Sequence, residues 1–201
     1  MNTVSFLRDN ARWITGGFLL CFFSSFGQTF FIALSGGEIR AEYGLSNGEW
    51  GSLYMLATLA SAATLTQLGR IVDHFPIATV TAIVIPMLGI ACFLMSWSQS
   101  VILLGVTLYL LRLFGQGMMT HTAMTAMGKW YAARRGTAVS FTTVGLQGGE
   151  ALLPIAMVSL FAAIGWRQSW LAMAILIVLF ALPAIYTLMR VERVPQASDG
   201  P

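Results

Sequence analysis

Six long apolar stretches account for most of this chain, and each is almost free of charge. Each is near or above the roughly 20 residues that an α-helix needs to cross the hydrocarbon core of a bilayer. The stretches lack the period-2 alternation of membrane barrel strands, which favours helices. The predicted spans are Trp13–Leu34, Trp50–Leu68, Ile77–Trp97, Val101–Met127, Thr137–Ile164 and Ser169–Met189. The pattern therefore predicts an all-α membrane protein with six transmembrane helices.

Composition agrees with a lipid bilayer as the solvent. The 201 residues are 57% hydrophobic and 9% charged, whereas soluble domains carry about 25% charged residues. No basic patch alternates with exposed aromatics, so a nucleic-acid partner is not expected. Cys21 and Cys92 lie inside apolar spans and are expected to be buried free thiols. No cofactor or metal is predicted. The first apolar run is too long for the h-region of a cleaved signal peptide.

The basic residues between the spans predict how the helices are oriented. Lys and Arg concentrate on the cytoplasmic side of membrane proteins. Eight basic residues lie on the side of the termini and two on the other side. The eight are Arg8, Arg12, Arg70, Lys129, Arg134, Arg135, Arg190 and Arg193; the two are Arg40 and Arg167. Both termini are thus expected in the cytoplasm. Residues 1–190 form the predicted bundle, and the polar segment 191–201 is expected to be a flexible tail or the start of a linker.

Two charged residues lie deep inside the spans, Arg112 and Glu150. A charge near the middle of a membrane helix costs roughly 2.5–3.5 kcal/mol on insertion scales, so it is seldom kept without a role. At 1.5 Å per residue, Arg112 lies roughly 16 Å and Glu150 roughly 20 Å along their spans, near the bilayer midplane. Their spans are antiparallel neighbours in sequence, which would allow the two charges to meet.

Polar residues accompany both charges at helical spacing. Residues four or seven apart share one side of a helix. The two predicted polar faces consist of Arg112, Gln116 and Thr120 on span four and Thr143, Gln147 and Glu150 on span five, and span one adds Ser24, Ser25 and Gln28. We expect the first, fourth and fifth spans to line a wet cavity, while the third and sixth face lipid.

These residues allow a functional and a structural interpretation. In the first, Arg112 binds substrate or a proton-carrying group, and Glu150 is its partner or the proton acceptor, with Gln28, Gln116 and Gln147 around them. In the second, the pair is a static ion bridge between two helices. The sequence leaves both open.

Three further features of the spans have simpler interpretations. His121 lies about 180° round the helix from Arg112, so a structural role is expected. Gly145 and Gly149 form a G-x-x-x-G pattern, which favours close helix packing over a hinge. Pro154 is expected to bend span five just beyond Glu150.

Three segments carry motifs of one known protein family. The loop Gly69-Arg-Ile-Val-Asp73 resembles G-x-x-x-D-R-x-G-R/K, the signature loop of the major facilitator superfamily, although His74 replaces the usual arginine. Arg112-Leu-Phe-Gly115-Gln-Gly117 resembles an arginine followed by glycines in the family's span four, often linked to proton coupling or substrate binding. The cytoplasmic basic loop that contains Lys129, Arg134 and Arg135 looks like that of monocarboxylate and oxalate/formate-type members.

The resemblance implies a secondary transporter of which this chain is one half. Family members have twelve spans in two six-helix halves with the substrate site between them, and this chain resembles the N-terminal half. It would be a fragment, or it would pair with a separate C-terminal half or a second copy. The Gly69 and Asp73 loop would serve conformational change.

The predicted function is transport of a small organic anion by alternating access, with proton coupling, in a bacterial inner membrane. A non-transporting membrane scaffold or regulatory half-protein is the alternative. An intramembrane enzyme is not expected, because H-E-x-x-H does not occur and His121 points away from the polar face, where it could not serve as the base of a serine nucleophile.

Overall fold

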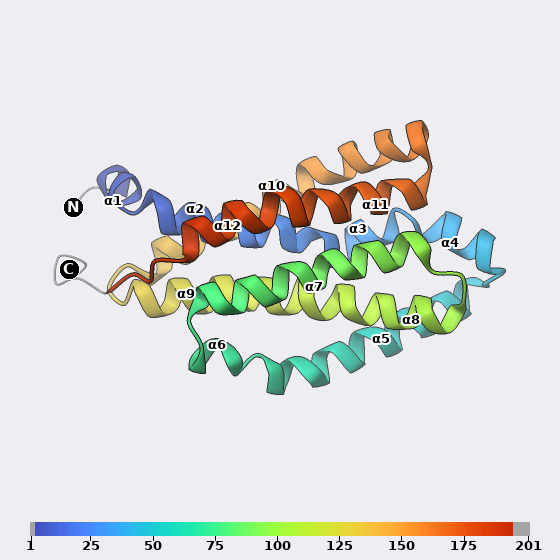
Figure 1. The fold of residues 1–201 in the computed structure, drawn as a ribbon, viewed down its shortest axis with the longest axis horizontal. Helices are drawn as coiled ribbons and strands as arrows, with labels where there is room; N and C mark the ends of the chain where they lie inside the picture. Colours follow the sequence, from blue (N-terminus) through green and yellow to red (C-terminus); the bar gives the residue numbers. More distant parts are fainter. Residues whose placement is uncertain (1–2, 195–201) are drawn as a thin grey trace.

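The computed structural model describes residues 3–194 and shows a bundle of long helices that run side by side (Figure 1). Six of them are long and apolar enough to cross a membrane, which confirms the predicted all-α architecture. They comprise Ala11–Ala33, Asn47–His74, Ile77–Trp97, Val101–Trp130, Arg135–Ile164 and Trp166–Met189. The short helix α1 (Thr3–Asp9) and the end of α12 (Leu182–Met189) lie at the same end of the bundle. We call this the terminus end, and the opposite end the loop end.

The first span is not the continuous helix that the sequence predicts. It consists of α2 (Ala11–Ser24), a 3₁₀ turn η1 (Ser25–Gly27) and the short α3 (Thr29–Ala33). Gln28 between them is extended, with φ −81° and ψ 153°. The stretch 35–49, which lies between the first two predicted spans, contains another helix, α4 (Gly36–Tyr43). The backbone of span one is therefore interrupted within the membrane-spanning length.

Side-chain caps set where the second and fourth spans begin. Helix α5 (Asn47–Leu68) starts with a capping box, in which the Ser46 hydroxyl accepts from the Glu49 amide and the Glu49 carboxylate accepts from the Ser46 amide. The Ser100 hydroxyl likewise accepts from the Leu103 amide at the start of α8 (Val101–Leu110). The remaining elements are α6 (Ile71–His74), α7 (Ile77–Trp97), η2 (Leu111–Met119), α9 (Thr120–Trp130), α10 (Arg135–Ile164), α11 (Trp166–Leu176) and η3 (Ile177–Ala181).

Two spans contain π-helical segments rather than regular α-helix throughout. In span four, η2 separates α8 from α9, and in span six, η3 separates α11 from α12. A π segment leaves a local mismatch in the backbone hydrogen bonds and is frequent at functional sites. Helix α10, by contrast, continues through Pro154 as one helix.

The core forms where the first, third and fourth spans meet. Helix α2 packs against α10, α9 and α12, while α7 packs against α11, α8 and η2. An aromatic series surrounds the interruption in span one: Phe26 lies 4.9 Å from Phe31, and Phe31 lies 5.4 Å from Trp170, measured between ring centroids. The Trp170 indole donates to the Ser35 hydroxyl at 2.8 Å. These contacts stabilise the interrupted segment.

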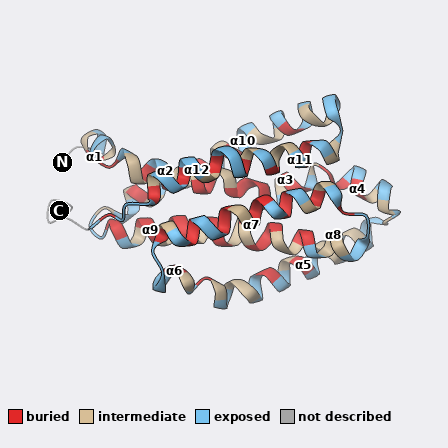
Figure 2. Ribbon diagram, viewed as in Figure 1, coloured by how far each residue is buried: buried red, intermediate tan, exposed pale blue. Residues whose placement is uncertain are grey.

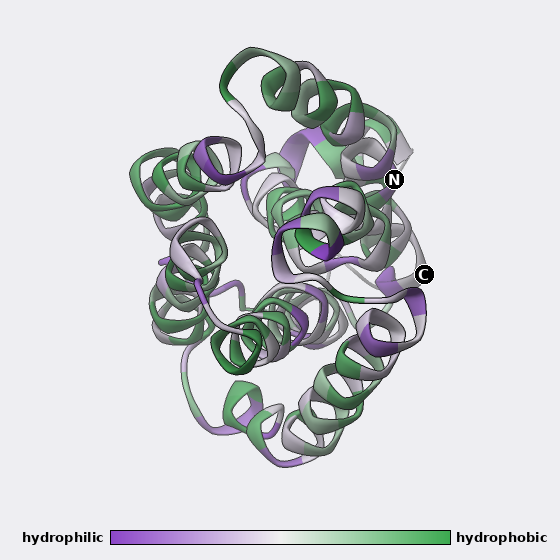
Figure 3. Cartoon of the chain, turned by 90° about the vertical axis from the view of Figure 1, so that its right-hand side faces the viewer, coloured by the Kyte–Doolittle hydropathy of each residue, from purple (hydrophilic) through white to green (hydrophobic). Residues whose placement is uncertain are grey.

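The outer helices differ in how much of their surface the bundle covers. In Figure 2, α5 and α10 lie at the two edges and are largely exposed or intermediate. Within the apolar stretch of each span, 22% of the residues are buried in the second span and 11% in the fifth. The corresponding share in the third span is 50%. Helix α7 therefore has one buried and one exposed side. It belongs to the core, whereas we expected the third span to face lipid. Viewed along the bundle, the spans are predominantly hydrophobic (Figure 3), as a bilayer requires.

The G-x-x-x-G pattern of α10 packs directly against α2, as predicted. A Cβ atom on Gly145 would overlap the Phe18 carbonyl oxygen, and one on Gly149 would overlap the Ser25 hydroxyl. Small residues allow this close approach of two membrane helices. The contact fixes the rotation of α10 about its own axis.

The segment after span six is held to the bundle instead of leaving it freely. Arg193 is 7% exposed. Its Nε donates to Asn10 Oδ1 at 2.8 Å, and its Nη1 donates to the Trp130 carbonyl at 2.6 Å. Residues 191–194 thus differ from the flexible tail that we expected, and the rest of that tail, 195–201, lies outside the described residues.

We predict that Gly145→Ala lowers the free energy of unfolding by roughly 1–3 kcal/mol, because the added methyl group meets a backbone oxygen that cannot move aside. Gly148→Ala is the matched control on the same helix, since its Cβ would meet the Phe22 ring at 3.7 Å, an ordinary contact. Denaturation by SDS in mixed micelles measures both variants. Equal stability of the two would contradict the packing of α10 on α2.

Candidate functional site

The guanidinium of Arg112 lies in the middle of the bundle, at the interruption of span one. Arg112 belongs to η2 and is 8% exposed. Its Nη1 donates to the Gly27 carbonyl at 3.3 Å and to Thr29 Oγ1 at 3.1 Å. Its Nε is buried and has no hydrogen-bond partner among the described residues. Arg112 therefore stabilises the broken backbone of span one and retains unused donors.

Two glycines bring this irregular backbone together. A Cβ on Gly27 would overlap the Leu111 carbonyl oxygen, and a Cβ on Gly115 would lie 2.6 Å from the Gly27 Cα. Larger residues would therefore force η1 and η2 apart. The backbones of the two segments are close enough for the Arg112 side chain to reach across to the Gly27 carbonyl.

Tyr54 and Thr29 complete the surroundings of Arg112, and neither residue was predicted from the sequence. The Arg112 Cζ lies 5.4 Å from the centroid of the Tyr54 ring, within the range of a cation–π interaction. The Tyr54 hydroxyl donates to Thr29 Oγ1 at 2.9 Å. Single uncharged polar residues are common in membrane helices, so neither stands out in the sequence. The sequence offered one signal for each: Thr29 directly follows Gln28, and Tyr54 lies near the aromatic start of span two.

The structure does not bring Glu150 to Arg112. Within residues 3–194, no ion pair joins them, and Glu150 is exposed on α10. The predicted static bridge between these residues is therefore wrong. Helix α2 packs against both α10 and η2, and the glycine face of α10 is turned toward α2. Glu150 lies about 100° round the helix from Gly149, away from that contact.

The predicted glutamines divide between the same two places. Gln28 lies at the interruption of span one and Gln116 in η2, both partly buried. The backbone nitrogen of Gln116 lies close to Gly27, where an added Cβ would be 2.6 Å from it. Gln147 is exposed on α10, as is Glu150. The predicted site thus separates into a central group at Arg112 and a surface group on α10.

At the terminus end, the structure joins two segments that the sequence identified separately. Lys129 forms an ion pair with Asp73 at 3.1 Å and donates to the Val72 carbonyl at 2.8 Å. His121 Nε2 lies 3.1 Å from the Gly69 carbonyl oxygen. The loop between spans two and three is thus tied to the end of span four, and His121 has the structural role we expected.

The other two basic residues of this loop contact different neighbours. The Arg134 guanidinium lies over the Phe6 ring, 5.3 Å from its centroid. Arg135 donates from Nε to the Gly128 carbonyl at 3.2 Å. They support the loop and α1 rather than the central site.

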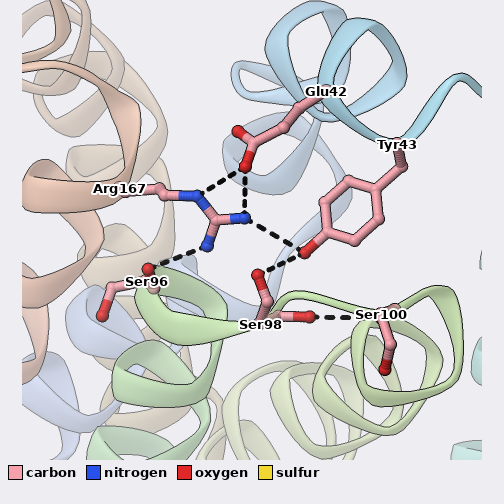
Figure 4. Close-up of polar contacts among 6 residues, drawn as sticks. All are labelled: Glu42, Tyr43, Ser96, Ser98, Ser100 and Arg167. Atoms are coloured by element: carbon pink, nitrogen blue, oxygen red, sulfur yellow. Dashed lines mark hydrogen bonds and ion pairs between the residues drawn. The ribbon is translucent and has the colours of Figure 1, made fainter.

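A second polar cluster, at the loop end, surrounds Arg167 (Figure 4). Arg167 forms an ion pair with Glu42 at 2.6 Å and donates to the Ser96 carbonyl at 2.9 Å. Arg167 Nη2 also donates to the Tyr43 hydroxyl at 3.2 Å, and that hydroxyl donates to the Ser98 carbonyl at 2.6 Å. The cluster fastens α4 to the end of α7 and the start of α11. Each of the three guanidinium nitrogens has a protein acceptor, so this arginine is structural.

Comparison with known proteins gives a consistent result. The family model for the Major Facilitator Superfamily matches residues 17–201. The chain is also 27% identical over 161 residues to the probable sulfoacetate transporter SauU of Cupriavidus necator. That alignment covers 80% of this chain and 37% of the relative. The aligned part is thus well under half of that protein.

A double-mutant cycle tests the separation of Arg112 from Glu150. For Arg112→Gln and Glu150→Gln, we predict a coupling energy below roughly 0.5 kcal/mol in the free energy of unfolding, as for residues without shared partners. The cycle of Glu42→Gln with Arg167→Gln is the control, with an expected coupling of at least roughly 0.5 kcal/mol because the two side chains share one network. A coupling for Arg112 with Glu150 as large as the control would restore the ion pair.

Proposed function

This chain belongs to the major facilitator superfamily and is an integral membrane protein, and we propose that it functions in transmembrane transport and moves a small organic anion. The proposal includes alternating access, proton coupling and a bacterial inner membrane with both termini in the cytoplasm. The six helices form one wall of the pathway, and the opposite wall is a second six-helix half or a second copy. No enzymatic activity is proposed.

The observation that carries this proposal is a buried cation without a carboxylate. Arg112 is 8% exposed, and its partners among residues 3–194 are a carbonyl, a hydroxyl and an aromatic ring. Burying a guanidinium in a membrane bundle is costly unless an opposite charge compensates it. An anionic substrate would supply that charge each time it binds.

The relative's name supports the same substrate class. Sulfoacetate, which that protein is named as transporting, carries a carboxylate and a sulfonate. Arginine binds both groups through parallel hydrogen bonds. We propose that the substrate of this chain likewise carries a carboxylate or sulfonate that contacts Arg112.

Glu150 is the proposed proton acceptor. Its carboxylate is exposed on α10, the least covered span. A charged group at this depth is unfavourable against lipid, so it is expected to face a water-filled cavity or a polar partner. Because Glu150 does not pair with Arg112, proton binding and anion binding would use separate groups in this half.

Uptake by proteoliposomes tests the proposal. With protein expressed from its complete natural coding sequence, we predict that Arg112→Ala lowers kcat/KM for radiolabelled sulfoacetate by at least roughly a hundredfold, about 2.7 kcal/mol of binding to a charged group. Glu150→Gln should retain binding and lose the dependence of uptake on a proton gradient.

Arg8→Ala is the control, because this arginine lies at the terminus end with its side chain 82% exposed. If Arg112→Ala and Glu150→Gln both transport as Arg8→Ala does, the assignment of these residues fails. Normal membrane insertion with no solute uptake at all would favour the scaffold alternative.

A further inference from the structure

The hydrogen-bond partners of Arg112 occupy one end of its guanidinium and leave another edge unused. Nη1 carries two N–H groups, and these donate to the Gly27 carbonyl and to Thr29 Oγ1. Nε carries one N–H group, which is buried and lacks a partner among residues 3–194. The hydrogen bonds described for Arg112 do not involve Nη2. The unused edge therefore runs from Nε to Nη2.

An unpartnered N–H group in this position is unfavourable. Leaving a buried donor unsatisfied costs roughly 1–3 kcal/mol, and more when the group is charged, and most such groups in proteins have a partner. The Nε–Nη2 edge presents two parallel N–H groups at the spacing of two oxygens of one carboxylate or sulfonate. A single oxyanion group would satisfy both donors at once.

We propose that Thr29 and Tyr54 are positioning residues that orient Arg112 so that its Nε–Nη2 edge binds one oxyanion group of the substrate through two hydrogen bonds. This inference rests on the proposed transport of an organic anion and adds which atoms bind it. Thr29 Oγ1 fixes Nη1, and the Tyr54 hydroxyl in turn donates to that oxygen at 2.9 Å. The Tyr54 ring lies beside the guanidinium, with its centroid 5.4 Å from Cζ.

The shared Thr29 oxygen connects the three side chains. It accepts from both Arg112 Nη1 and the Tyr54 hydroxyl. Without this oxygen, Nη1 loses one of its two acceptors and the guanidinium can rotate, so that the Nε–Nη2 edge is no longer held in one direction. A lysine at 112 would keep the charge but could not present two parallel donors.

Binding of methanesulfonate tests this arrangement without requiring transport. Methanesulfonate is a single sulfonate group, and dimethyl sulfone is its uncharged analogue of similar shape. The shift of the thermal unfolding midpoint with ligand concentration gives Kd for the purified protein, expressed from its complete natural coding sequence. We expect methanesulfonate, but not dimethyl sulfone, to stabilise the wild-type protein.

The variants separate positioning from folding. Thr29→Val removes the shared oxygen at nearly constant volume and should raise Kd roughly tenfold, the loss of about one charge-assisted hydrogen bond. Thr29→Ser retains the oxygen and should bind as the wild type does. Arg112→Lys should raise Kd at least as much, and Thr29→Val should add nothing further in that background. Tyr54→Phe should give a smaller rise than Tyr54→Leu, which also removes the ring.

Several outcomes would overturn the proposal. These are an unchanged Kd in Thr29→Val, an equal loss in Thr29→Ser, additive effects of Thr29→Val and Arg112→Lys, or no specific stabilisation of the wild type by methanesulfonate. If uptake nevertheless depends on Arg112, the transport of an anion stands and the binding edge is wrong. If Arg112→Ala leaves both binding and uptake unchanged, the proposed function also fails at this site.

Discussion

The hydrogen bonds from Arg112 to the interrupted first span hold the centre of this bundle together. The turn η1 and the extended Gln28 leave the Gly27 carbonyl outside a regular helix, and a buried carbonyl without a donor would destabilise the fold by roughly 1–3 kcal/mol. Arg112 supplies that donor from the π-helical segment of span four, and Gly27 and Gly115 permit the close approach. The stability of span one and the position of the buried charge therefore depend on the same contact.

Hydrogen bonds and ion pairs connect separate segments of the chain at both ends of the bundle. At the loop end, Arg167 connects α4, α7 and α11 through Glu42 and two backbone or hydroxyl acceptors. At the terminus end, Lys129 binds the loop between spans two and three, and Arg193 is buried against Asn10 and Trp130. Between these ends, α5 and α10 expose most of their surface, and Glu150 lies on the more exposed of the two. This distribution is compatible with the proposed second six-helix half or second copy, which would cover the exposed middle of the bundle.

The sequence identified the central cation but not its partners. Arg112 was recognisable because a charge inside an apolar run has a high energetic cost. Thr29 and Tyr54 have no comparable cost and occur in many membrane helices for packing alone. The pairing of Arg112 with Glu150 was inferred from similar depth, but depth along a helix does not fix rotation about its axis. Gly145 and Gly149 set that rotation by packing against α2, and this turns Glu150 away from η2.

The sequence alone determined the number of spans, their approximate limits, the bilayer as solvent and the resemblance to the superfamily, which the family match bears out. Those properties depend on hydrophobic length, on composition and on short motifs, all of which are local in the chain. The tertiary structure decided where span one breaks, that Lys129 joins Asp73, and which donors of Arg112 remain unused. These depend on the rotation and axial offset of helices that are far apart in sequence, which contacts between backbones fix only when the bundle has formed.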